Sequence, residues 1–222
     1  RETVQIIIEF GRSSSEIADS EDNDRMIHSY FYKAKQRVLE GTVDGSRFAD
    51  EFLLPIAEMW PRAWEYLADF YRDCSMDNDR IAYALRRAVE IFPRDRELWL
   101  RRAKHAEEMK DYSARISSLI SAVECDPCNV PLIKEVAYHL CSYVADHKFD
   151  IPTMRRGTYL ASVRAHMENV SDKLDATGLS RLAWLFLLEN NTKKARLYAD
   201  KGLQMDASNA HCQKIMLALE DD

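Results

Sequence analysis

The sequence predicts an all-α protein built from repeated helix pairs, and three observations support this. There are only six glycines and six prolines among 222 residues. That is well below the average share of about 12% and argues against a β-protein with many tight turns. Apolar residues recur at i, i+3, i+4 and i+7, the stripe of an amphipathic helix. Two such runs end alike at Pro93 and Pro127, 34 residues apart, which indicates a repeat.

Composition and charge exclude several classes of protein. Hydrophobic residues make up 46% of the chain and charged residues 31%, an ordinary balance for a soluble globular protein. The net charge of -6 argues against nonspecific nucleic-acid binding as the main function. The longest apolar runs, such as Ala183 to Leu188, fall far short of the ~18 residues of a membrane span, so we expect no membrane partner.

Cysteine usage and the first residue bear on location and context. Five cysteines, an odd and sparse set, indicate reduced thiols and a cytoplasmic location. The sequence opens at Arg1 rather than at methionine. We therefore expect a fragment of a longer protein, or a processed chain.

The first 60 residues are the least regular part. Thr3 to Phe10 has the propensity of a strand, but in a helical context we expect a helix of a degenerate first pair. Ser13 to Asp24 is polar and acidic and is predicted to be a loop. We expect the whole segment 1–60 to be helical and to pack on the repeats that follow.

Two amphipathic helices are predicted within this segment. The first covers 26–38, with Asn23 or Asp24 as its N-cap and Gly41 as its stop signal. The second covers 48–59 and contains Pro55, which we expect to bend it.

From residue 61 onward the chain shows copies of one pattern. The run Ala88 to Pro93 matches Ala122 to Pro127, and Gly202 to Ala207 is a third version with alanine in place of proline. Each copy carries an apolar stripe upstream, made of Trp64, Leu67, Ala68 and Tyr71, of Trp99, Arg102, Ala103 and Ala106, or of Leu179, Leu182, Ala183 and Phe186.

This pattern resembles the tetratricopeptide repeat (TPR) family, whose 34-residue unit carries a tryptophan, leucine, glycine or alanine, tyrosine, alanine and proline signature. The resemblance implies a right-handed α-solenoid of antiparallel helix pairs. The copies expected are 61–95, 96–129, 130–175 and 176–209, followed by a capping helix within 210–222.

The copies are not identical in length. The first has one extra residue in its Ser75 to Asn78 turn. The third has an expanded turn at Asp146 to Pro152 and a lengthened second helix. In the cap, Cys212, Ile215, Met216 and Leu219 are expected to face inward.

Small and charged residues within the copies carry further expectations. Ala103, Ala122 and Ala199 are expected at tight helix crossings. Arg102 and Arg115 stand where the repeat is normally apolar, so each must reach solvent or a carboxylate.

No catalytic motif is present. The glycines are scattered singly, and the sequence has no H-E-x-x-H and no Gly-x-Ser-x-Gly. We therefore expect no enzyme activity, no cofactor and no small-molecule substrate.

The pair Cys125 and Cys128 forms a C-x-x-C, which is half a zinc site or a redox pair on one interpretation. His139 and Cys141 are not at recognised ligand spacing, so we expect a packing position and a turn residue instead, and no metal.

In the TPR family the first helix of each repeat lines a concave groove. The resemblance implies groove positions at Arg62, Glu65, Asp69, Arg72, Asp73, Glu97, Leu100, Lys104, Glu107, Glu108, Tyr138, Thr177, Ser180, Trp184, Leu187 and Leu188. The acidic Glu65 and Asp69 would repel the carboxylate tail of a heat-shock chaperone, which some family members bind. At the apolar end, Trp184 and its leucine neighbours are either partner anchors or packing residues.

A basic stretch has two interpretations. It contains Arg86, Arg87, Arg94, Arg96, Arg101, Arg102 and Lys104. The acids Glu90, Asp95 and Glu97 lie among them, which fits ion pairs on helix surfaces. The alternative is a basic patch for a phosphorylated, acidic or RNA partner.

Two functions follow. The first is protein–protein recognition, with the chain as a scaffold or sensor arm of a larger protein that binds a protein or peptide segment. The alternative rests on Leu98 to Lys104 with Glu107 or Glu108, which resembles the half-a-TPR (HAT) repeat of RNA-processing scaffolds.

Overall fold

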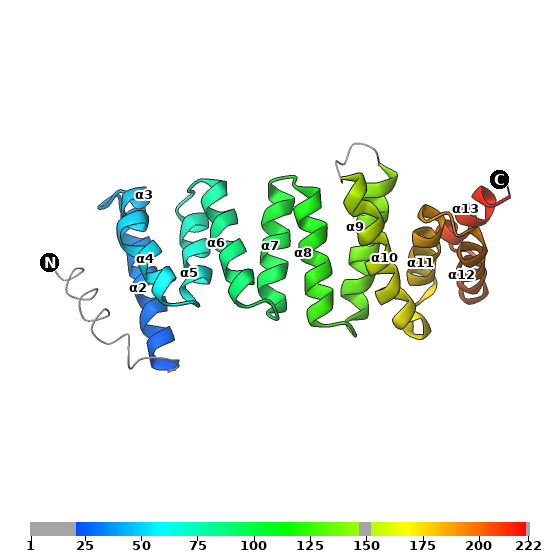
Figure 1. Cartoon of the computed structure of the whole chain (residues 1–222), viewed down its shortest axis with the longest axis horizontal. Helices are drawn as coiled ribbons and strands as arrows, with labels where there is room; N and C mark the ends of the chain where they lie inside the picture. The colour runs from blue at the N-terminus through cyan, green and yellow to red at the C-terminus, as the bar shows by residue number, and fades with distance from the viewer. Residues whose placement is uncertain (1–20, 147–151, 221–222) are drawn as a thin grey trace. The chain divides into compact units, whose positions relative to one another are not determined.

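The structure is a computed structural model that describes residues 21–146 and 152–220 (Figure 1). These residues form helices and no strand, so the all-α prediction is confirmed for them. The prediction for Thr3 to Phe10 lies outside the described residues, as does most of the expanded turn after Asp146. No helix in the described part of the chain combines the length and the apolar character that crossing a membrane requires.

The chain divides into two compact units, Arg1–Pro93 and Arg94–Asp222. This boundary lies between the first two expected copies and not after residue 60. The physical reason is that α2 and α4 of the N-terminal segment pack on α5, the first helix of the first copy.

The first unit contains α2 (Glu21–Leu39), α3 (Gly45–Phe48), a π-helical turn η1 (Ala49–Leu53), α4 (Leu54–Met59), α5 (Ala63–Asp73) and α6 (Asn78–Ile91). Helices α5 and α6 form the pair expected within 61–95. Its largest fully buried side chains include Trp64, Phe70, Ile27, Leu53 and Leu67. Trp64 and Leu67 belong to the stripe that the sequence indicated.

The start of α2 corrects two predictions. Residues 21–24 are already helical, so neither Asn23 nor Asp24 is the N-cap of α2, and the predicted loop is wrong for its last four residues. Asp24 instead accepts a hydrogen bond of 2.9 Å from the hydroxyl of Tyr66 on α5. That contact ties the first turn of α2 to α5.

The end of α2 is as predicted. Gly41 has φ +71° and donates to the carbonyl of Val38, while Thr42 donates to the carbonyl of Arg37. This is the Schellman arrangement that satisfies the last carbonyls of a helix.

The disturbance expected at Pro55 takes the form of a π-helical turn. Proline has no N–H to donate to the residue four positions back. In η1, just before it, the N–H of Leu54 bonds to the carbonyl of Ala49, five residues back. The helical path therefore continues through Pro55 with one wider turn.

The second unit contains α7 (Arg96–Glu108), α8 (Tyr112–Cys125), α9 (Val130–Ala145), α10 (Thr153–Asn169), the short 3-10 helix η2 (Ser171–Lys173), α11 (Ala176–Leu188), α12 (Thr192–Met205) and α13 (Ala210–Ala218). Neighbouring helices pack on one another, and α11 also packs on α9 and α13 (Figure 1). The lengthened second helix of the third copy is confirmed, because α10 has 17 residues while α8 and α12 have 14 each.

The helix N-caps of the second unit recur at the interval of the sequence repeat. Helices α7 and α9 are capped by Asp95 and Asn129, and α11 and α13 by Asp175 and Asn209. The residues of each pair stand 34 apart in the sequence. In each case the side chain accepts from a backbone N–H of the first turn, which stabilises the helix start.

The turns within pairs repeat as well. After α5, α7 and α11, a residue other than glycine adopts positive φ, at Ser75 (52°), Lys110 (58°) and Asn190 (58°). The next residue in each case donates to a carbonyl five positions back, namely that of Tyr71, Ala106 or Phe186. These are Schellman turns at equivalent places.

Small and charged positions behave as the sequence implied. Ala103, Ala122 and Ala199 are buried, as are Cys212, Ile215 and Leu219 of the cap. Arg102 lies over the ring of Trp99, 5.6 Å from its centre. Arg115 is only 8% exposed, yet it reaches the carboxylate of Glu107 at 2.7 Å.

Candidate binding groove

A groove of about 490 Å³ lies in the second unit, between α9, α11 and α13. It is lined by Tyr138, Ser142, Thr177, Ser180, Arg181, Trp184, Leu187, His211, Lys214, Ile215 and Ala218. Its volume falls in the range of about 300–1,000 Å³ that is usual for ligand pockets.

Helical spacing brings these residues together. On α11 the lining residues are Thr177, Ser180, Trp184 and Leu187, each three or four residues from the next, together with Arg181, four residues after Thr177, so they share one face. The same spacing holds on α13 from His211 to Ala218, and Tyr138 and Ser142 are one turn apart on α9. Three helix faces therefore border one groove.

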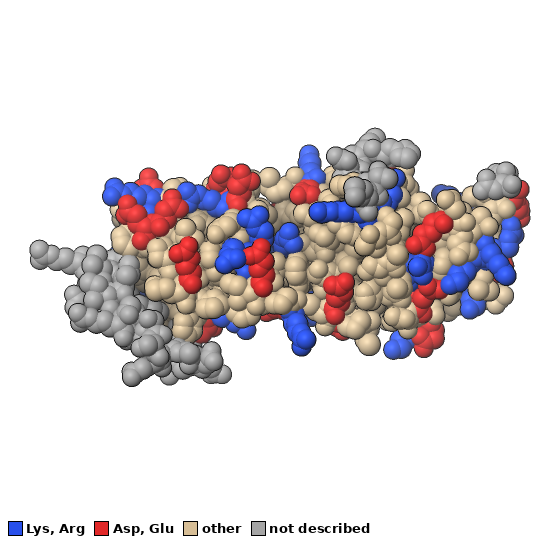
Figure 2. Space-filling view, viewed as in Figure 1, with Lys and Arg blue, Asp and Glu red and all other residues tan. Residues whose placement is uncertain are grey.

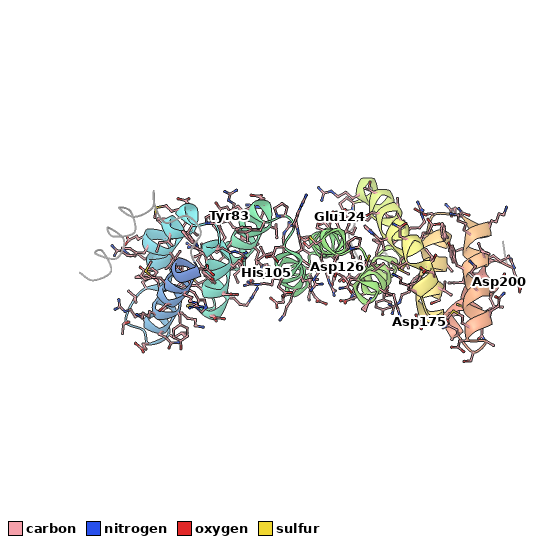
Figure 3. The ribbon with its side chains drawn as sticks, turned by 90° about the horizontal axis from the view of Figure 1, so that it is seen from below. Tyr83, His105, Glu124, Asp126, Asp175 and Asp200 are labelled. Carbon is pink, nitrogen blue, oxygen red and sulfur yellow. The ribbon has the colours of Figure 1, made fainter. Side chains whose placement is uncertain are left out.

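Contacts at the start of α11 fix it against α9. Asp175, labelled in Figure 3, caps α11. It accepts from the N–H of Gly178 at 2.7 Å and from Lys134 of α9 at 2.8 Å. The hydrogen bond from Lys134 lowers the pKa of Asp175 below its ordinary value. Arg181 donates to the carbonyl of Lys134 at 2.9 Å, further along α11.

The third wall, α13, is held by close packing. Its cap Asn209 accepts from the N–H of Cys212 at 3.0 Å. The Sγ of Cys212 lies 3.9 Å from the carbonyl oxygen of Ala176 on α11 and against Gly202 of α12. Both α11 and α13 are therefore fixed by buried contacts behind the groove.

The apolar residues of the groove have a double role. Trp184 and Leu187 are partly buried and pack against the core of the second unit, while they also line the groove. Tyr138 is 47% exposed, and the guanidinium of Arg181 lies 5.2 Å from the centre of its ring. Packing and exposure thus coexist in the same side chains.

Five residues expected in the groove meet there. They are Tyr138, Thr177, Ser180, Trp184 and Leu187.

Leu188 does not join them. It lines a separate cavity of about 660 Å³ with Phe186, Arg164 and Lys194. It is four residues after Trp184 and so shares that face of α11, but it is the last residue of the helix and lies beyond the stretch that borders the groove.

The remaining expected groove residues lie elsewhere. Leu100 on α7 is partly buried against the core of the second unit, and Lys104 is exposed. Glu97, Glu107 and Glu108 of α7 do not line the groove, and Glu107 pairs with Arg115 of α8. Asp73 of α5 pairs with Lys35 of α2. Arg62, the N-cap of α5, pairs with Glu65 at 3.1 Å, and Arg72 of α5 pairs with Asp69 at 3.5 Å. These four charges belong to the first unit and are satisfied along their own helix.

The basic stretch is divided between the units. Arg86 and Arg87 lie on α6 of the first unit, and Arg94 and Arg101 belong to the second. Arg87 pairs with Glu90 at 2.7 Å, and Arg86 lies over Tyr83, which Figure 3 labels. On the face shown in Figure 2, positive and negative side chains are interspersed.

Sequence reasoning missed Arg181, His211 and Lys214. The signal was present for the last two, because α13 begins 34 residues after α11. Adding 34 to Thr177 and Ser180 gives His211 and Lys214. The cap is therefore equivalent to the first helix of another copy.

A second polar cluster surrounds Arg115 on α8. Arg115 donates to the hydroxyl of Tyr143, and its other terminal nitrogen lies 3.2 Å from the Nε2 of His139. Burial lowers the pKa of His139, and the positive charge of Arg115 lowers it further. Burial likewise raises the pKa of Tyr143. The cluster joins α8 to α9 and does not line the groove.

The cysteine pair has the surroundings of packing and turn residues. Cys125 is half-buried at the end of α8, and Cys128 is exposed in the turn before α9. Within residues 21–146 and 152–220, no three His, Cys, Asp or Glu side chains are grouped to hold a metal ion.

Comparison with models of known protein families finds no match to this chain. Comparison with curated proteins finds none either.

Proposed function

We propose that this chain is a TPR-like protein-interaction module, a scaffold or sensor arm that binds a segment of a partner protein between α9, α11 and α13. In this proposal the helix pairs are antiparallel and stack with a right-handed twist inside each unit. The 34-residue spacing of the helix caps supports the repeat.

One observation carries the proposal. Tyr138, Trp184 and Leu187 are picked out of the sequence by the phase of the repeat alone, and all three line the same groove. Large, partly exposed aromatic and aliphatic side chains in a concave site are typical anchors for a partner. Because α11 also buries Leu182 and Phe186 on its other side, the anchors stand on a rigid support.

The test compares two tyrosines in matched surroundings. Tyr138 in the groove is 47% exposed and lies beneath Arg181, while Tyr83 in the first unit is 39% exposed and lies beneath Arg86. Replacing either by alanine removes an exposed ring and one cation–π contact. A pull-down from a lysate of the source organism, with crosslinking, then compares Tyr138→Ala, Tyr83→Ala, Trp184→Ala and wild type.

We expect Tyr138→Ala and Trp184→Ala to lose the partner and Tyr83→Ala to retain it. A buried tryptophan anchor contributes about 2 kcal/mol or more, so Trp184→Ala should weaken binding at least about thirtyfold. Circular dichroism melts check that the variants remain folded. If the groove variants capture the partner as wild type does, the groove is not the binding site.

A second part of the pull-down experiment distinguishes the RNA-scaffold alternative from the protein-binding proposal. Capture that disappears on ribonuclease treatment, and that falls in Arg87→Glu with Arg101→Glu rather than in Trp184→Ala, would replace the proposal. The pairing of Arg87 with Glu90 and of Arg96 with Asp126 at 2.8 Å favours a structural role for this stretch.

A further inference from the structure

The groove between α9, α11 and α13 is lined by positive charge and by no carboxylate among the described residues. Arg181, His211 and Lys214 are among its lining residues, and no aspartate or glutamate of the described chain is. The net charge of the chain is -6. The sign of the groove is thus opposite to that of the whole chain.

In two other cavities of the described residues, positive side chains pair with carboxylates. In the cavity next to Leu188, Arg164 pairs with Glu189 at 2.6 Å and Lys194 with Glu168 at 2.8 Å. In a small cavity between α2 and α5, Lys35 pairs with Asp73 at 2.8 Å. Arg164, Lys194 and Lys35 are therefore matched by this chain's own carboxylates.

The groove cations remain available to a ligand. Lys214 and His211 are exposed and form no ion pair among the residues that the structure describes. Arg181 donates a hydrogen bond to the carbonyl of Lys134, and a guanidinium carries several further donors. Next to half-buried apolar walls, these donors would interact with a carboxylate more strongly than they would in open water.

We propose, on the basis of the proposed function, that the groove selects a protein segment in which acidic side chains flank one large apolar side chain. The apolar side chain packs against Trp184, Leu187 and Ile215. The acidic side chains pair with Lys214 and Arg181.

A nucleic acid fits these observations less well. Affinity for a nucleic-acid backbone comes mainly from Lys and Arg contacts to many phosphates, whereas the Lys and Arg side chains that line the groove are Arg181 and Lys214. Its lining also includes Leu187, Ile215 and Ala218 beside the aromatic rings. These walls suit an aliphatic or aromatic side chain.

The experiment does not require that the partner be identified. A random dodecapeptide display library is selected on wild type, and peptides that also bind Tyr138→Ala are discarded. The peptides that remain are synthesised in two forms, as selected and with every Asp and Glu replaced by Asn and Gln. Affinities are measured at low and at high salt.

Two charge reversals test the residues. Lys214→Glu changes a groove cation, while Lys201→Glu makes the same change on α12, where the ammonium lies over Tyr198 outside the groove. We expect Lys214→Glu to weaken the acidic peptides at least about tenfold at low salt and Lys201→Glu to weaken them less than about twofold. The difference should shrink at high salt because of screening.

The outcomes separate the two proposals. The acidic preference is wrong if the Tyr138-dependent peptides are neutral or basic, or if they bind equally well with Asn and Gln in place of Asp and Glu. In either case the groove is still a binding site. If no Tyr138-dependent peptide is recovered, both proposals are wrong. If a uridine oligonucleotide displaces the peptides and binds more tightly in a Tyr138-dependent way, the ligand is RNA and the peptide inference fails.

Discussion

Gly202 faces Cys212 so closely that a Cβ on residue 202 would lie 2.5 Å from the Sγ of Cys212. The same Cβ would lie 3.4 Å from the carbonyl oxygen of Ala176. Helices α11, α12 and α13 therefore meet at a point where only glycine fits without movement. This contact fixes the position of α13, the third wall of the groove, against α11 and α12.

Gly202→Ala should destabilise the protein by about 1–3 kcal/mol through overpacking. This loss outweighs the gain of roughly 1 kcal/mol that alanine normally brings to a helix interior. Urea unfolding measures the change.

Gly157→Ala on α10 is the matched control, because a Cβ there meets nothing within 4 Å. It should stabilise by about 0.5–1 kcal/mol. Adding Cys212→Ala to Gly202→Ala should recover part of the loss. Equal stability of Gly202→Ala and wild type would show that α13 is not held in this way.

Asp175 has two functions that substitution can separate. An asparagine at this position would still cap α11 but would lose the ion pair with Lys134. Asp175→Asn should therefore cost about 0–1 kcal/mol at pH 7, because the carboxylate is exposed. Asp175→Ala should cost about 1 kcal/mol more through loss of the cap. Thermal or urea unfolding of both variants measures the two contributions.

The pH dependence of the Asp175→Asn effect has a defined sign. The pKa of Asp175 is lowered in the folded protein. The pair therefore contributes fully above the unfolded pKa of about 3.9, and its contribution is lost as the pH falls through the lowered folded value. The difference between wild type and Asp175→Asn should be constant from about pH 7 to pH 5 and shrink as the pH falls below the unfolded pKa. A difference that grows on acidification would contradict this.

Arg115→Met should raise the pKa of His139. The substitution removes a positive charge beside the imidazole and leaves the burial, the larger cause, largely in place. NMR titration of the imidazole protons of His139 detects the change. An unchanged His139 titration would show that Arg115 does not face the ring in solution.

The same variant should destabilise the protein by about 1–3 kcal/mol, because the buried Tyr143 hydroxyl loses the donor that Arg115 supplies. Adding Tyr143→Phe removes the hydroxyl that has lost this donor. The double variant should therefore be more stable than Arg115→Met alone.

The cysteines should differ in their reaction with a thiol reagent. Cys128 is exposed and should react first, and Cys128→Ser should leave stability unchanged within about 0.5 kcal/mol. Burial raises the pKa of Cys141, so this thiol should react only when the protein unfolds. Stoichiometric zinc in the purified protein, lost in Cys128→Ser, would contradict the assignment of Cys128 to a simple turn.

Much of the helical structure is predictable because the same spacing of apolar residues recurs in each copy of the repeat. The windows 96–129 and 176–209 each hold one packed pair, and the extra residue after Asp73 is visible as a longer turn before α6. Apolar spacing and proline positions are local signals, so the sequence alone is sufficient for them.

What sequence reasoning missed depends on contacts between helices. The first turn of α2 includes Asp24, whose partner Tyr66 is 42 residues away and so gives no local signal. Leu188 was assigned to the groove because the family pattern includes this position, but Leu187 is the last residue of α11 that lines the groove, and where a groove ends depends on the neighbouring helices. Arg181 is not a groove position of the repeat at all, and its place follows from its bond to the Lys134 carbonyl.

Ser75, Lys110 and Asn190 share a backbone conformation and no side-chain chemistry. A hydroxyl, an ammonium and an amide all occupy a left-handed turn that glycine would enter with less strain. The repeat is therefore visible in the backbone dihedral angles at positions where the amino-acid types differ. A comparison of amino-acid types finds three different residues, whereas a comparison of backbone torsion angles identifies one turn position that occurs three times.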